Sequence, residues 1–357
     1  MKLLAIDVGM GTQDILLYDS HENIENCFKM VLPSQTRIIA QRIIEETALK
    51  KDIVLTGETM GGGPCAAAIK RHLKANLSVF ATEKAALTLN DDLEKTKEIG
   101  VVIVKENEVT ELNASVIKMC DIDKAALTEA FALFGVPIPQ NFAVAVQDHG
   151  FSPAGSNRVF RFEYFREIIE KGATLDSFVY TNNTKKIPER FTRMIAVERT
   201  LPGAMLMDTG MAAIRGALLD ECAREPHLVV NIGNGHTLSG IIDNGKLIAL
   251  MEHHTQQMTS GKLDDYLMRL CNGTLGFDEV FNDGGHGCYV KEAIGFENIG
   301  SILVTGPQRE IMRGSKLEFS FASPYGDMML TGCFGLVDAY MHYLRNCNSD
   351  SLRDERN

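Results

Sequence analysis

A strand, a glycine turn and a second strand occur twice in this chain of 357 residues, and this repeat limits the folds that the chain can adopt. Residues 3–12 and 228–237 are each an apolar run that ends in a Gly-x-Gly turn, and a second apolar run follows each turn. One constant offset aligns the two copies, pairing Asp7 with Asn231, Gly9 with Gly233, Gly11 with Gly235 and Asp19 with Asp243. The repeat predicts two related halves, each with a hairpin whose turn can approach a ligand because glycine has no side chain.

A Gly-x-Gly turn in a single hairpin need be only a turn, since glycine serves turns of many kinds. Two features favour a ligand site instead: the turn is duplicated, and an acidic or amide residue (Asp7 or Asn231) precedes each copy. Turns of this kind present backbone N–H groups to anions such as phosphate.

Residues 7–14 resemble the first phosphate motif of the actin-like ATPase superfamily, which includes sugar and acetate kinases and heat-shock chaperone ATPases, and residues 231–237 resemble the second. The resemblance implies an α/β protein with two ribonuclease-H-like domains and a central interdomain cleft. It also implies that the chain binds ATP and that Asp7 organises Mg²⁺. The residues that it places at the nucleotide are Gly9, Gly11, Thr12, Asn231, Gly233, Asn234, Gly235, His236, Thr237, Gly306, Pro307 and Gln308.

Three positions depart from the superfamily pattern. The superfamily usually has Asp at position 231 and Thr or Ser at position 236, where this chain has Asn231 and His236. Mg²⁺ prefers hard, charged oxygen ligands, so the amide weakens half of the usual metal support. In the adenosine-binding strand, residues 301–308, Pro307 replaces a second glycine and fixes the local backbone. Nucleotide binding tolerates these changes better than catalysis does.

The order of apolar runs predicts the domain organisation. About 150 residues per domain suggests two domains, and short β runs alternating with amphipathic runs are typical of α/β proteins. We expect an N-terminal ribonuclease-H-like domain with insertions at residues 1–204 and a small-residue connecting helix at 205–225, whose Asp208 serves packing or the site. A C-terminal ribonuclease-H-like domain at 226–345 and a flexible tail at 346–357 complete the chain.

Two segments of the first half are expected to lead into or form helices. Residues 33–49 carry isoleucines at helical spacing and are expected to form the first crossover helix, between strands at 14–19 and 53–56. The glycine-rich residues 57–64 lead into a helix at 66–72, where they form either an anion-binding loop at the helix start or a flexible connection.

Asp148 and His149 are the best candidates for acid–base work, because they directly follow an apolar strand at residues 142–147. The carboxyl ends of strands in open α/β sheets face the ligand crevice. There Asp148 or Gln147 would orient an attacking water or accept a proton from a substrate hydroxyl. Asp283, in a glycine loop, is a second candidate. The alternative for either aspartate is a side chain that caps a turn.

Several histidines lie in turn-rich segments: His149, His236, His253, His254 and His286. A transition-metal site would use such residues, but no H-x-x-x-H or C-x-x-C spacing is present, and neighbours on a strand point to opposite faces. Glu252 and His254 would share a face. We therefore favour loop histidines or ligand contacts over a metal site.

Seven segments spread over the chain resemble a mainly archaeal family, DUF1786, which is labelled a pyruvate-formate-lyase-activating enzyme. They are residues 146–150, 202–208, 233–237, 252–255, 284–287, 305–309 and 324–332. The label does not suit the sequence. A radical-SAM activating enzyme holds its iron–sulfur cluster with a C-x₃-C-x₂-C run, and the eight cysteines here are scattered singly.

Composition excludes several classes of partner. The net charge is −11 and no basic cluster exceeds Lys185 and Lys186, which argues against nucleic acid. No apolar run is long enough to span a membrane. Asp7 interrupts the only apolar stretch that could be a signal sequence. The unpaired cysteines are typical of a protein in a reducing cytoplasm.

Three functions follow from these patterns. The first is an ATP-dependent phosphotransferase or ATPase that closes two domains over Mg·ATP. The second is a catalytically degenerate nucleotide or ligand switch, or an activating partner of another protein. The third, metal-dependent hydrolysis, depends only on the histidines. Besides the nucleotide, a small molecule or a protein is the expected partner.

Overall fold

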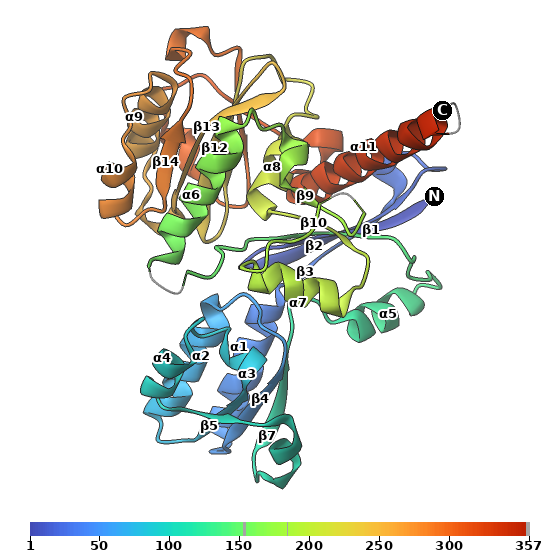
Figure 1. The fold of residues 1–357 in the computed structure, drawn as a ribbon, viewed down its shortest axis with the longest axis vertical. Coiled ribbons are helices and arrows are strands. Elements are labelled where there is room, and N and C mark those ends of the chain that lie inside the picture. The colour runs from blue at the N-terminus through green and yellow to red at the C-terminus, as the bar shows by residue number, and fades with distance from the viewer. Residues whose placement is uncertain (153–154, 184, 355–357) are drawn as a thin grey trace.

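The computed structural model describes residues 1–152, 155–183 and 185–354, and its two largest sheets each have six strands (Figure 1). The first sheet has the strand order β3 (Phe28–Pro33), β2 (Thr12–Asp19), β1 (Lys2–Val8), β8 (Phe142–Val146), β10 (Met205–Met207) and β9 (Val179–Tyr180). The second has the order β14 (Gly287–Val290), β13 (Lys246–His254), β12 (His236–Asp243), β11 (His227–Ile232), β15 (Ser301–Thr305) and β16 (Ser320–Phe321).

The two sheets repeat one pairing scheme. In the first sheet β1, β2 and β3 are antiparallel neighbours, and β8 and then β10 pair in parallel beyond β1. In the second, β11, β12 and β13 are antiparallel, and β15 and then β16 pair in parallel beyond β11. The duplication predicted from the two glycine turns is therefore confirmed. This strand order is that of the ribonuclease-H-like fold, in both halves.

A third sheet stands apart from the other two, at the lower end of Figure 1. It consists of four parallel strands in the order β6 (Val101–Val104), β5 (Val79–Thr82), β4 (Ile53–Gly57) and β7 (Ser115–Met119). Its helices are α1 (Gln35–Ala48), α2 (Gly63–Lys74), α3 (Glu83–Ala86) and α4 (Leu93–Glu98). The helix expected to cross within the first sheet is α1, and it packs in this inserted unit on α2 and β7 instead. Residues 34–119 are thus a module between β3 and β8.

The remaining helices cover the two large sheets. They are α5 (Lys124–Ala132), α6 (Asn157–Glu170), α7 (Thr192–Thr200), α8 (Thr209–Ala217), α9 (Ser260–Cys271), α10 (Phe277–Asn282) and α11 (Thr331–Asp354). Apolar residues of α5 and α7 pack on one face of the first sheet, and those of α9 pack on one face of the second. One further core, which includes Leu3, Val229 and Phe334, continues through both halves. No helix in the described part of the chain has the length and apolar character to cross a membrane.

Two helices pack across the expected domain boundary. The C-terminal helix α11 lies on α8 and on β1, β2 and β8 of the first sheet, and α6, from the first half, packs on β13 and β14 of the second (Figure 1). The stretch expected as a connecting helix begins with strand β10 and becomes helical only in α8. The tail expected to be flexible continues α11 to Asp354, and residues 355–357 lie outside the described residues.

Close contact between α8 and α11 depends on glycine, as the small residues of α8 predict. A Cβ on Gly216 of α8 would lie 1.8 Å from the carbonyl oxygen of Thr331, and one on Gly335 of α11 would lie 2.0 Å from that of Ala212. Any side chain at either position therefore separates the helices.

We expect Gly216→Ala to lower the free energy of unfolding by about 1–3 kcal/mol, the usual cost of overpacking a core. Urea denaturation followed by circular dichroism measures this. Gly261→Ala is the matched control, because Gly261 lies in helix α9 with open space around its Cα and alanine favours a helix. A Gly216 variant as stable as wild type would contradict the proposed contact.

Candidate functional site

The two glycine turns meet at the centre of the molecule. A Cβ on Gly11 of the first turn would lie 2.3 Å from the side-chain nitrogen of Asn234 in the second, and one on Gly235 would lie 3.3 Å from Met10. Each turn closes with the same hydrogen bond, from Gly9 N–H to the Thr12 carbonyl and from Gly233 N–H to the His236 carbonyl, both 2.9 Å. The repeated turns therefore face each other.

A cavity of about 390 Å³ lies beside these turns, within the range of small-molecule sites. Among the hydrogen bonds of the described residues, none uses the N–H groups of Met10, Gly11, Asn234 or Gly235. Of the residues expected at a nucleotide, those that line the cavity are Gly9, Thr12, Asn231, Gly233, Asn234, Gly235, His236, Gly306 and Pro307. Unpaired N–H groups at its edge suit an anion.

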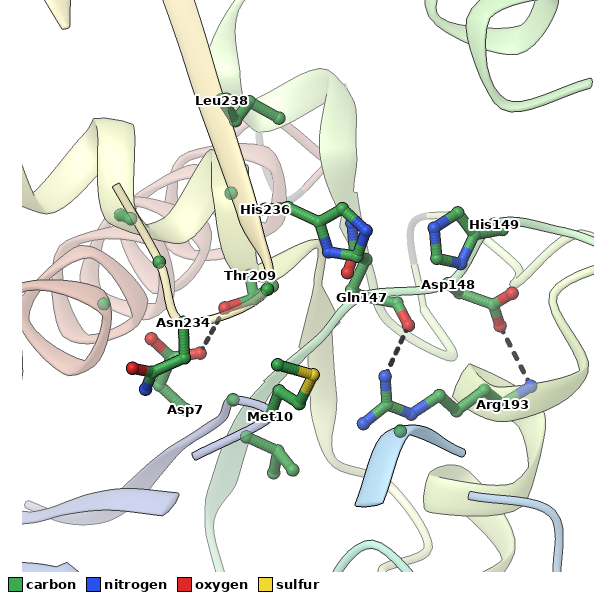
Figure 2. A pocket seen from close by; sticks show the side chains of 18 of the residues that line it. Asp7, Met10, Gln147, Asp148, His149, Arg193, Thr209, Asn234, His236 and Leu238 are labelled. Carbon is green, nitrogen blue, oxygen red and sulfur yellow. Dashed lines mark hydrogen bonds between the residues drawn. The ribbon is translucent and has the colours of Figure 1, made fainter. Parts of the chain in front are cut away.

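Two carboxylates lie together on the floor of this cavity. Asp7 and Asp14 are directly paired across the β1–β2 hairpin, and Asp7 accepts a hydrogen bond of 2.5 Å from the hydroxyl of Thr209 (Figure 2). Burial raises the pKa of Asp7 to about 7, against the effect of that bond. Burial and then the charge of Asp7 raise the pKa of Asp14 to about 8.

One oxygen of this pair has no partner. Oδ1 of Asp14 is buried without a hydrogen bond in the described part of the chain. Hard oxygen atoms are the ligands that Mg²⁺ prefers, so the residues present fit a divalent cation. Asp14 takes part in this arrangement although the sequence singled out Asp7 alone. Gly332 encloses the pair, because a Cβ there would lie 1.9 Å from Asp7.

The loop after β15 joins the second turn, as expected of the adenosine strand. Gly306 has φ +98°, and a Cβ on it would lie 2.4 Å from the carbonyl oxygen of Ile232. Gln308 does not line the cavity directly, but its side chain donates a hydrogen bond of 3.1 Å to Asn234. The glycine-rich loop between β4 and α2 of the inserted module reaches the same cavity through Thr59, Met60, Gly62 and Gly63.

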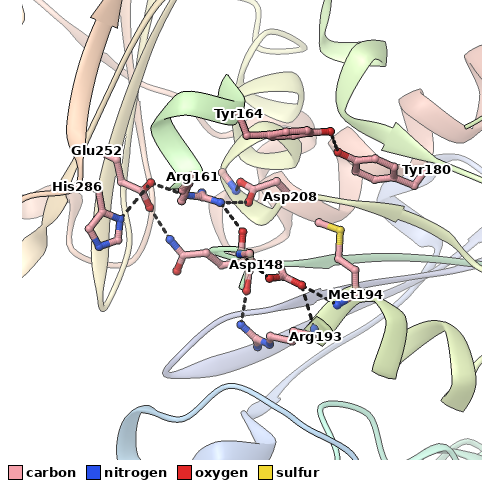
Figure 3. A network of polar contacts seen from close by, with 12 residues as sticks. Asp148, Arg161, Tyr164, Tyr180, Arg193, Met194, Asp208, Glu252 and His286 are labelled. Carbon is pink, nitrogen blue, oxygen red and sulfur yellow. Dashed lines mark hydrogen bonds and ion pairs between the residues drawn. The ribbon is translucent and has the colours of Figure 1, made fainter. Parts of the chain in front are cut away.

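Asp148 lines the cavity, but its carboxylate is engaged by the backbone. It accepts hydrogen bonds of 2.9 Å from the N–H groups of Gly150, Arg193 and Met194, two of which begin helix α7 (Figures 2 and 3). Burial raises the pKa of Asp148 while these bonds oppose the rise. The arrangement favours the turn-capping interpretation over acid–base work, since the carboxylate holds the loop that carries His149.

A buried ion-pair network forms part of the cavity wall and connects the two halves (Figure 3). Arg161 of α6 donates to Glu252 of β13 at 2.7 Å and to Asp208 at 2.8 Å, and the amide of Gln147 donates to the other oxygen of Glu252. Burial alone would raise the pKa of Glu252, but Arg161 and then His286 hold it well below its usual range. Asp208 also caps α8 through the N–H of Gly210.

Four histidine rings gather beside Glu252. The ring centres of His236 lie 4.6 Å from His286 and 5.6 Å from His149, and His254 lies 4.9 Å from His236. Burial lowers the pKa of His149 well below its usual range and that of His236 to about 3. The imidazoles of His149 and His236 are therefore neutral at pH 7. His253 faces the opposite side of β13, as alternation along a strand predicts.

Asp283, Thr237 and Gly11 lie elsewhere than the sequence suggested. Asp283 is held by Lys262, Tyr266 and His253, away from the cavity lining, so the structure does not support it as a catalytic residue. The hydroxyl of Thr237 pairs with that of Thr255 at 3.1 Å on the other face of β12. Gly11 lies against Asn234 and does not line the cavity.

The sequence model of one protein family, described as "Putative pyruvate format-lyase activating enzyme (DUF1786)", matches residues 60–311, which is most of the chain. The chain belongs to this family. The second glycine turn of this DUF1786 protein lies within the matched residues, and the first lies before them. A comparison with proteins of curated function finds no match.

Several solved structures resemble the DUF1786 protein distantly. A putative N-acetylmannosamine kinase from Listeria monocytogenes is 12% identical over 96% of this chain and 99% of its own, with a TM-score of 0.33. A putative sugar kinase from Cytophaga hutchinsonii is 11% identical over 96% and 100%, with a TM-score of 0.30. The activator of 2-hydroxyisocaproyl-CoA dehydratase from Clostridium difficile, with bound ADPNP, is 8% identical over 97% and 98%, with a TM-score of 0.29. The strand order described above carries the fold assignment for the DUF1786 protein.

Proposed function

We propose that this DUF1786 protein binds Mg·ATP in the cleft between its two halves and acts as an ATP-dependent phosphotransferase or ATPase. The observation that carries the proposal is the meeting of both glycine turns at one cavity with Asp7 and Asp14 on its floor. The free N–H groups of the turns would bind phosphate oxygens. Asp7 and Asp14 would hold Mg²⁺, which neutralises phosphate charge when bound.

The residues around the cavity explain how such a site would work. Phosphoryl transfer depends on positioning and on charge stabilisation more than on covalent help from the protein. Thr209 orients Asp7 through a hydrogen bond, and Gly332 leaves room for that carboxylate. The loop of the inserted module, with Thr59 and Gly62, borders the cavity from a third direction. It is therefore the segment best placed to contact a phosphoryl acceptor.

A second function, a nucleotide-dependent switch or activating partner, is favoured by one specific observation. Asp148 is the residue that would act as a base, but its carboxylate already accepts hydrogen bonds from three backbone N–H groups. Asn231 adds to this, because an amide gives weaker support to Mg²⁺ than a carboxylate does. In that case nucleotide binding would change domain closure without turnover.

Thermal denaturation with and without Mg·ATP tests the common premise. At a ligand concentration of about 100 times Kd, binding stabilises a protein by about 2.7 kcal/mol, so we expect the denaturation midpoint to rise by several degrees. Asp7→Asn should lose most of this rise. The control is Asp19→Asn, at the partly exposed far end of the β1–β2 hairpin and outside the cavity lining.

An assay for ADP release then separates the two functions. Steady ADP production by wild type would support the enzyme, and a thermal rise without ADP would support the switch. No rise with any nucleotide would contradict both.

A further inference from the structure

Three histidines from separate segments converge beside the nucleotide cleft. One ring nitrogen from each of His149, His236 and His286 lies within 4.8 Å of the other two. His149 follows β8, His236 begins β12 and His286 precedes β14. The first belongs to the N-terminal half and the other two to the C-terminal half, so the cluster forms only when the halves meet.

A buried carboxylate stands behind the cluster. Oε2 of Glu252 lies 3.3 Å from Nδ1 of His286, and both side chains are almost fully buried, with 1% and 2% of their surface exposed (Figure 3). Arg161 and Gln147 fix the orientation of Glu252. Nδ1 of His286 has no hydrogen bond among the described residues, and this carboxylate is the acceptor within reach of it. Histidines that bind metals are commonly oriented by a neighbouring carboxylate, which also makes the imidazole a better ligand.

We propose that His149, His236 and His286 bind a divalent transition-metal ion, with zinc as the best fit, at a site distinct from the Mg²⁺ site. Imidazole nitrogens suit zinc and related metals, whereas Mg²⁺ takes oxygen ligands such as Asp7 and Asp14. Three protein ligands leave a fourth position open in a tetrahedral zinc site. Since His149 and His236 line the cavity, that position faces the cleft.

The spacing of the nitrogens connects metal binding with closure of the halves. Zinc–nitrogen distances of about 2.0–2.1 Å place tetrahedral nitrogens roughly 3.3 Å apart, less than the 4.8 Å that bounds the cluster. A bound ion would draw His149 toward His236 and His286 and so hold the two halves together. Its open position would take an oxygen atom of a water or of an anionic ligand in the cleft.

Metal titration of the full chain tests the proposal. The purified protein is stripped with a chelator, its metal content is checked by mass spectrometry, and Zn²⁺ is titrated in competition with a coloured chelator. Co²⁺ is titrated separately, because tetrahedral cobalt gives strong visible absorption. His149→Ala and His236→Ala are compared with His21→Ala, whose histidine is exposed in the turn after β2. Circular dichroism confirms the fold of each variant.

We expect wild type and His21→Ala to bind one zinc ion per chain, and each cleft variant to bind at least ~10-fold more weakly and to lose the cobalt absorption. Asp7→Asn should keep zinc binding while it loses the Mg·ATP effect, so the two sites can fail independently. Zinc binding to His149→Ala as tight as to wild type would overturn the proposal. If the cleft variants do not fold, wild type alone decides: without stoichiometric cobalt absorption, the site does not exist.

Discussion

Replacing Arg161 with methionine is expected to lower the free energy of unfolding by about 3–5 kcal/mol, the cost of leaving buried carboxylates without their cation. Arg161 has 3% of its surface exposed, and it is the ion-pair partner of both Glu252 and Asp208. Methionine keeps much of the apolar volume of the side chain, so the loss would come from the charges. Urea denaturation, read from the transition midpoint, measures the change.

Two comparisons make this result specific. Arg313→Met removes an exposed partner of Glu310 and should leave the midpoint almost unchanged. The double variant Arg161→Met with Glu252→Gln should recover part of the loss, because one of the two stranded charges is then removed. If the single variant matches wild type, or if the double variant is no better than the single one, the network does not hold the halves together as we infer.

Replacing Asp14 with asparagine is expected to stabilise the ligand-free protein at pH 8.5 by several kcal/mol, because folding moves the pKa of Asp14 from about 3.9 to about 8 and each pKa unit corresponds to about 1.4 kcal/mol. The same change should abolish stabilisation by Mg·ATP. Asp14 is buried beside Asp7, its pKa is raised to about 8, and one of its oxygens has no hydrogen bond in the described residues. A residue that binds a ligand commonly destabilises the protein when the ligand is absent.

The pH dependence has a definite sign. Aspartates of the unfolded chain ionise near pH 3.9, whereas Asp7 and Asp14 of the folded protein have pKa values raised to about 7 and about 8. Between about pH 3.9 and 8, therefore, these two aspartates bind more protons in the folded protein than in the unfolded chain. The contribution of these two aspartates to the free energy of unfolding therefore falls as the pH rises from about 4 to 8. Below and above this range their contribution does not change with pH.

Binding of Mg²⁺ needs the ionised carboxylates, so stabilisation by Mg·ATP should grow across the upper part of this range, from pH 6 to 8.5. Denaturation midpoints measured with and without Mg·ATP at several pH values check this. Asp19→Asn, at the partly exposed end of β2, should show neither the gain in stability nor the loss of the ligand effect. Stabilisation that is equal at pH 6 and pH 8.5 would be inconsistent with a cation held by Asp7 and Asp14.

Local patterns were sufficient for the hairpins but not for the inserted module. The apolar runs beside the glycine turns give β1, β2, β11 and β12 nearly as expected, because the side-chain period and the turn chemistry are both local. Helix α1 was also found, but the sequence did not show that it belongs to the inserted module. The apolar face of this helix indicates that it is buried, but it does not indicate on which sheet the helix packs. β5 and β7 went unnoticed because strands of four and five residues, with three apolar side chains each, are a weak signal.

Long-range contacts decided the rest of the site. Asp148 has the sequence context of a base, but its carboxylate accepts hydrogen bonds from the nearby N–H of Gly150 and from two N–H groups at the start of the distant helix α7, as a cap does. Arg161 shows no motif at all, and it becomes central only because α6 packs on the second sheet. The histidines lack any metal-binding spacing since their ligand atoms come from three segments.

The sequence by itself determined that the chain has two related halves, each with a glycine turn, because duplication and the need for glycine at a tight turn are visible in single segments. Only the tertiary structure decided that the turns face each other, that Asp14 shares the floor of the cleft with Asp7, and that three histidines converge. The two turns lie more than two hundred positions apart, and the three histidines come from separate segments. Asp7 and Asp14 are close in the sequence, but their energies depend on burial and charge that exist only after the halves have packed.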